Sequence, residues 1–95
     1  MSSHELYRHE GKNFRSVYAR VGPDDFRIDT QDMGPTTEEV WGDSDYEFWT
    51  KVPKAAWGDL LIALAKEFLS NEEATDRLKE ICQAHGVEHE WDCWR

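Results

Sequence analysis

Hydrophobic and polar residues alternate along much of the first half of the chain, a pattern typical of half-buried β-strands. On this pattern the sequence predicts strands over residues 6–9, 14–21, 26–30 and 45–52. Glycine, proline, asparagine and aspartate mark turns at 10–13 and 22–25. Such short connections favour antiparallel hairpins. Residues 32–44 form a longer predicted loop.

The alternation in the last of these predicted strands divides its side chains between two faces. Alternation places Tyr46, Phe48, Thr50 and Val52 on one face, and Glu47, Trp49 and Lys51 on the other. The first set is mainly apolar, so we expect it to face the interior. The second set combines an indole with charge and is expected to face outward.

In the second half of the chain, apolar residues recur at the spacing of α-helices. We expect the first helix to begin at Pro53, because proline suits the first helical position. Its apolar stripe is Trp57, Leu60, Leu61, Leu64 and Phe68, which we predict to be core. The second helix carries Ala74, Leu78, Ile81 and Cys82 on one side. A capping box from Ser70 to Glu73 is predicted to start it, and Gly86 to end it.

Alternation returns at 87–94 and predicts a final strand. The expected fold is therefore α+β, with an antiparallel sheet of four to five strands and two antiparallel helices packed on one face, in the order β-β-β-β-α-α-β. A length of 95 residues fits a single domain spanning 1–95. Hydrophobic residues make up 39%, so the chain has enough apolar material for a small core.

The net charge is −9 and is concentrated in the middle of the chain. Residues 21–50 contain nine acidic residues and one arginine, whereas residues 1–20 are slightly basic. An acidic surface repels nucleic-acid phosphates and anionic membranes, so neither is an expected partner. It attracts basic proteins instead.

The N-terminal residues lack the apolar segment of a secretory signal, and the longest apolar run, 60–65, is too short to span a bilayer. We therefore expect a cytoplasmic protein. There, Cys82 and Cys93 are expected to be free thiols, although a disulfide between them is a second interpretation.

Four residue types that bind zinc lie near the C-terminus. Cys82, His85, His89 and Cys93 follow the spacing C-x2-H-x3-H-x3-C, which offers four ligands for a tetrahedral site. The spacing differs from that of common zinc fingers and ribbons. The alternative is that the cysteines are small apolar side chains and that the protein has no cofactor.

No nucleophile elbow, phosphate-binding loop or dinucleotide fingerprint occurs, so an enzyme is the less favoured class. The favoured hypothesis is a small protein-binding module, either an adaptor or an inhibitor or immunity-type protein. Exposed tryptophans surrounded by carboxylates are typical of interaction surfaces. The predicted partner-binding residues are Glu38, Glu39, Trp41, Asp43, Asp45, Glu47, Trp49 and Trp94.

Three alternatives remain open: a zinc-stabilised domain, a small enzyme, and self-association through an exposed sheet edge, so that the protein is a monomer or a homodimer. Cross-strand packing of the tryptophans on one another would remove them from any interface.

Overall fold

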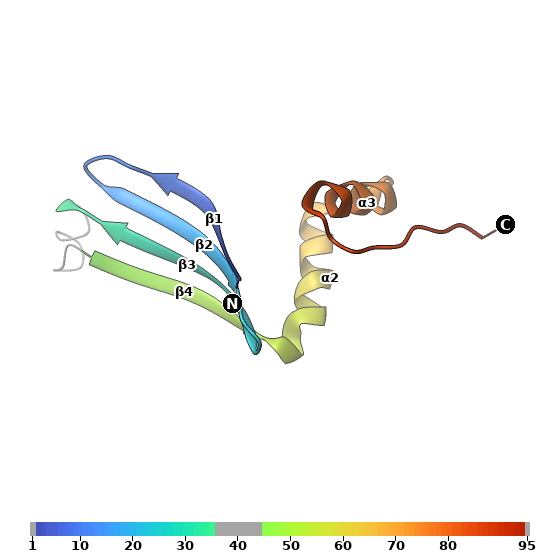
Figure 1. Cartoon of the computed structure of the whole chain (residues 1–95), viewed down its shortest axis with the longest axis horizontal. Helices are drawn as coiled ribbons and strands as arrows, with labels where there is room; N and C mark the ends of the chain where they lie inside the picture. Colours follow the sequence, from blue (N-terminus) through green and yellow to red (C-terminus); the bar gives the residue numbers. More distant parts are fainter. Residues whose placement is uncertain (1, 36–44, 95) are drawn as a thin grey trace. The chain divides into compact units, whose positions relative to one another are not determined.

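The computed structural model describes residues 2–35 and 45–94. Within them lie four strands, a 3-10 turn and two helices (Figure 1). These elements are β1 (Ser2–His9), β2 (Phe14–Val21), β3 (Asp25–Met33), β4 (Asp45–Pro53), η1 (Lys54–Ala56), α2 (Trp57–Phe68) and α3 (Ala74–His85). The α+β class predicted from the sequence is thus confirmed.

The four strands form an antiparallel meander in the order β1-β2-β3-β4 (Figure 1). Short turns connect β1 to β2 and β2 to β3, which favours the pairing of these neighbours. The predicted bounds of β2 are confirmed, whereas β1 begins four residues earlier and β3 runs on to Met33. The pairing of β1 with β2 is regular except for a bulge between Glu5 and Tyr7.

Residues opposite one another in the pairing share a face, so the register divides the sheet side chains into two sets. One set, which we call the apolar face, comprises Ser2, His4, Tyr7, His9, Arg15, Val17, Ala19, Val21, Phe26, Ile28, Thr30, Asp32, Tyr46, Phe48, Thr50 and Val52. The other set, which we call the charged face, comprises Ser3, Glu5, Arg8, Phe14, Ser16, Tyr18, Arg20, Asp25, Arg27, Asp29, Gln31, Met33, Asp45, Glu47, Trp49, Lys51 and Pro53. The predicted division of β4 is confirmed.

The first helix does not begin at Pro53. That residue ends β4, with ψ at 153°, and the helical backbone starts after it. A proline ring fixes φ near −65°, a value that both extended and helical backbone can use, so composition alone misplaces the boundary. The Trp57 Nε1 donates a hydrogen bond of 3.2 Å back to the Val52 carbonyl, which ties the start of α2 to the end of β4.

The predicted capping box is also wrong. The Ser70 hydroxyl donates to the Lys66 carbonyl at 2.7 Å, and the Glu73 N–H donates instead to Asn71 Oδ1 at 2.9 Å. Asparagine makes this local turn readily, and it outcompetes the serine here. The stop at Gly86 is confirmed, since its φ of 64° is the left-handed conformation that glycine adopts without strain.

Residues 87–94 form no strand in the structure, which corrects the predicted fifth strand. A strand requires a neighbour to share its hydrogen bonds, and this segment bonds locally instead. The Val87 N–H donates to the Cys82 carbonyl at 2.9 Å, and the Cys93 N–H donates to Asp92 Oδ1 at 2.7 Å. Alternation of residue types therefore was not sufficient to make a strand.

The described residues contain no buried hydrophobic side chain, whereas Ser16, Asp29 and Thr30 are buried. In particular, Leu61 and Phe68 of the predicted core are 65% and 76% exposed. Helical periodicity determines which side chains share a stripe, but it does not determine what covers them. Contacts group the chain into two compact units, Met1–Trp57 and Gly58–Arg95. A single domain with antiparallel helices covering one sheet face stays a prediction.

No helix among the described residues combines the length and hydrophobicity needed to cross a membrane.

Candidate functional site

A buried ion pair lies at the centre of the charged face. Asp29, on β3, is only 5% exposed, and its Oδ2 accepts a hydrogen bond of 2.6 Å from Arg20 Nε on β2. Arg27 Nε lies 3.2 Å from the same oxygen, but its buried N–H makes no hydrogen bond. Two guanidinium groups thus share one carboxylate, and the hydrogen bond that Arg20 donates to Asp29 raises the pKa of Arg20 above its ordinary value.

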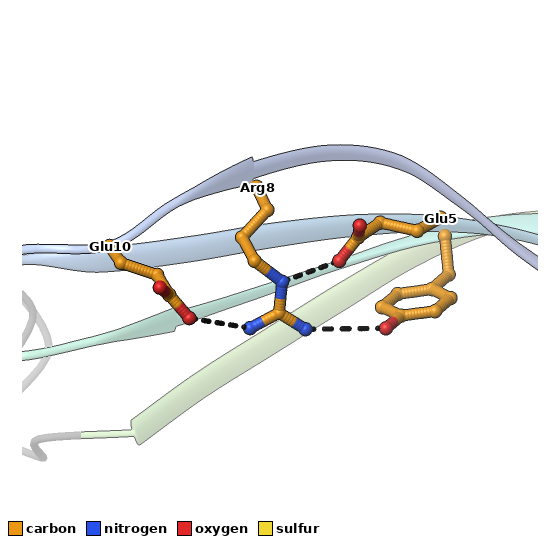
Figure 2. A network of polar contacts seen from close by, with 4 residues as sticks. Glu5, Arg8 and Glu10 are labelled. Atoms are coloured by element: carbon orange, nitrogen blue, oxygen red, sulfur yellow. Dashed lines mark hydrogen bonds and ion pairs between the residues drawn. The ribbon is translucent and has the colours of Figure 1, made fainter.

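Arg8 organises the β1 side of the same face. Figure 2 shows its guanidinium between Glu5 and Glu10, to which it donates. Its Nη2 also donates to the Tyr18 hydroxyl at 3.4 Å. These bonds, first that of Glu5 and then that of Tyr18, raise the pKa of Arg8. The guanidinium also lies 5.2 Å from the centre of the Phe14 ring. Two carboxylates therefore offset the charge of Arg8.

Aromatic rings of the charged face are covered by arginines. The Arg20 Cζ lies 4.9 Å from the Tyr18 ring centre, and the Arg27 Cζ lies 5.8 Å from the Trp49 ring centre. Both distances fall within the range of cation–π attraction. Trp49 nevertheless remains 54% exposed, so part of the indole is open to a partner.

Charge is unevenly distributed along this face. The register places Arg20, Arg27 and Lys51 in one row across β2, β3 and β4. Asp45 and Glu47 lie toward the opposite end of β4, where Gln31 donates a hydrogen bond to Asp45 at 3.2 Å. Glu47 is exposed and makes neither a hydrogen bond nor an ion pair with any described residue. The face is therefore basic at one end and acidic at the other.

The apolar face has a polar corner. Arg15 on β2 donates two hydrogen bonds to Asp32 on β3, at 2.6 and 2.7 Å, and the bonds raise the pKa of Arg15. Together with Tyr46 and Phe48, this pair lines an open hollow of about 360 Å³. The one carboxylate and the one guanidinium of the hollow neutralise each other.

The predicted partner-binding residues fall into three groups. Asp45, Glu47 and Trp49 share the charged face of β4. Trp94 lies beyond α3 in the other unit and is 98% exposed. The remaining four, Glu38, Glu39, Trp41 and Asp43, lie outside the described residues.

The predicted zinc ligands all belong to the second unit. Cys82 is half-buried on α3, His85 is its last residue, and Cys93 is exposed; both thiols are free. The His89 Nδ1 lies 2.8 Å from the Val87 carbonyl oxygen. Across residues 2–35 and 45–94, no three histidine, cysteine or acidic side chains gather in a way that could hold a metal ion. Zinc binding by these residues stays a prediction.

Sequence reasoning missed the network formed by Arg20, Arg27 and Asp29. A signal for it was present, because β2 and β3 place these charges at alternate positions. Which charge meets which carboxylate depends on the register between strands, and that register cannot be inferred from one strand alone.

Comparison of the chain with protein-family models, curated proteins and solved structures finds no match. The function must therefore be argued from the charged face itself.

Proposed function

We propose that this chain is a small acidic protein-binding module, an adaptor or an inhibitor or immunity-type protein, that docks a basic partner. The docking surface is the acidic end of the charged face, formed by Asp45, Glu47 and Trp49 on β4. The acidic sequence continues immediately before it, through Glu38, Glu39 and Asp43.

The observation that supports the proposal is the exposure of Trp49 beside Glu47, whose carboxylate makes no hydrogen bond with a described residue. Large aromatic side chains anchor protein interfaces when a partner covers them, and Trp49 is 54% exposed within a charged surface. Glu47 lies two positions before it on the same face of the strand and makes no hydrogen bond or close ion pair with a described residue, although its charge acts on Arg20 through space. Asp29, by contrast, is buried with two arginines and has no capacity to bind a partner.

Because this face is acidic at one end and basic at the other, it favours one orientation of the bound partner. Its cationic groups are attracted to the Glu47 end and repelled from the row of Arg20, Arg27 and Lys51. A net charge of −9 adds long-range attraction for any basic protein. Association is therefore expected to be fast and to weaken as salt is raised.

Affinity capture from native-source lysate tests this proposal. Three baits are compared at low and at moderate salt: the wild type, D45N/E47Q, and E88Q/E90Q as a control that removes the same charge from the C-terminal segment. We expect a stoichiometric basic protein on the wild type and the control, with much less on D45N/E47Q. An equal loss of capture in both variants would show that net charge, rather than this surface, binds the partner, and equal capture by all three baits would show that Asp45 and Glu47 do not bind it.

A further inference from the structure

We infer that the partner group that docks beside Trp49 is an arginine guanidinium and not a lysine ammonium. This inference rests on the proposed function and names the chemistry of its partner. The way in which the sheet binds its own arginines supports this choice of a guanidinium.

Three arginines of the sheet are each held by a carboxylate and a ring together. Arg15 binds Asp32 and lies 6.0 Å from the Phe48 ring centre, and Arg20 binds Asp29 beside Tyr18. Arg8 follows the same arrangement, with its carboxylates Glu5 and Glu10 and the ring of Phe14. The same combination of groups therefore recurs on both faces.

A guanidinium suits this combination because of its shape. The group is planar, so it can lie over a ring while its N–H groups donate within its plane to a carboxylate. An ammonium is compact and strongly hydrated, and it gains less from a ring and a carboxylate at once. The lysines agree with this distinction. Lys51 makes no contact of either kind with a described residue, and Lys79 lies 5.3 Å from the Trp91 ring centre without a carboxylate.

Trp49 and Glu47 offer a ring and a carboxylate that no arginine among the described residues binds together. They are two positions apart on one face of β4, so their Cα atoms are about 7 Å apart. Arg27 lies over the Trp49 ring, but the carboxylate that it pairs with is Asp29. Glu47 acts on Arg20 through space and makes no hydrogen bond with a described residue, so its oxygens can accept from a second guanidinium.

The test uses two pentapeptides of equal charge, with two arginines or two lysines alternating with glycine. Each is titrated into the full-length 15N-labelled chain, and the backbone amide resonances of residues 45–49, which every variant retains, report binding. The arginine peptide is expected to bind about fivefold more tightly. E47Q and W49L should remove this preference, whereas E88Q should retain it. Because Glu47 is exposed, E47Q keeps the test valid even where W49L fails to fold.

Two outcomes separate this inference from the proposed function. Equal affinity for the two peptides, with E47Q weakening both, would overturn the guanidinium preference and leave basic docking intact. Amide resonances of residues 45–49 that neither peptide shifts would overturn both proposals.

Discussion

Asp29 accepts a hydrogen bond of 2.6 Å from Arg20 while keeping only 5% of its surface exposed. This pair joins β2 to β3 under the charged face, and Arg27 adds a second positive charge at 3.2 Å. Acidic composition alone is a poor guide to docking capacity, because one of the acidic residues of the middle segment is fully engaged inside the sheet.

D29N should destabilise the fold, because the amide leaves two arginines without their shared counter-charge. We expect a loss of about 3 kcal/mol in the free energy of unfolding, measured by urea denaturation. D32N is the matched control. Its partner Arg15 has a 52% exposed side chain, so its loss should cost about 1 kcal/mol. A smaller effect for D29N than for D32N would show that the central pair does not stabilise the sheet.

G34A should also be destabilising, for a steric reason. Gly34 has a φ of 127°, and an added Cβ would lie 2.6 Å from the Lys12 carbonyl oxygen and 2.9 Å from Asn13 Oδ1. Forcing alanine into this backbone should cost about 2 kcal/mol or more in thermal unfolding experiments.

Gly58 provides a control of opposite sign for that prediction. It lies within α2, and an added Cβ meets nothing within 4 Å. G58A should therefore stabilise the protein by about 1 kcal/mol through helix propensity. A neutral or stabilising effect of G34A would contradict the close approach of Gly34 to the 10–13 turn, whereas a destabilising G58A would contradict only the prediction for α2.

W57F removes the indole N–H that bonds to the Val52 carbonyl at 3.2 Å, while it keeps an aromatic ring. We expect a loss of about 1 kcal/mol in the free energy of unfolding. Trp94→Phe should change stability very little, since Trp94 is 98% exposed. Equal effects of the two substitutions would argue that the bond at the start of α2 contributes nothing.

The zinc hypothesis has its own test. If Cys82, His85, His89 and Cys93 bind zinc, protein purified without chelators should contain about one zinc per chain. Chelation and C93S should then both lower the melting temperature, because binding is coupled to folding. Metal content near zero, with no effect of chelator, would end the hypothesis.

Local patterns predicted the sheet well. The alternation in β4 identified its faces, and turn residues predicted at 10–13 and 22–25 identified the hairpins, although Asp25 already belongs to β3. Both signals act within a few residues, so they can be read from the chain directly. The failures at Pro53, Ser70 and 87–94 share another feature. In each, two local conformations suit the same residues, and the choice depends on a hydrogen-bond partner that the sequence pattern does not reveal.

The candidate site was predicted only in part. Asp45, Glu47 and Trp49 were expected on the outer face of their strand, and they share it. The basic end of that face was missed, because Arg20 and Arg27 lie in separate strands and meet only through the register. This face is thus basic at one end and acidic at the other, rather than uniformly acidic.

The central claim is that docking occurs at a particular place and not wherever the chain is acidic. The most direct measurement is a backbone amide chemical-shift map of the 15N-labelled chain during titration with a basic peptide. The region 72–92 supplies the comparison, since it is also rich in acidic residues. The account predicts that the largest shifts fall at 45–49 and disappear in D45N/E47Q. Shifts spread equally over 45–49 and 72–92, or centred on the latter, would contradict it.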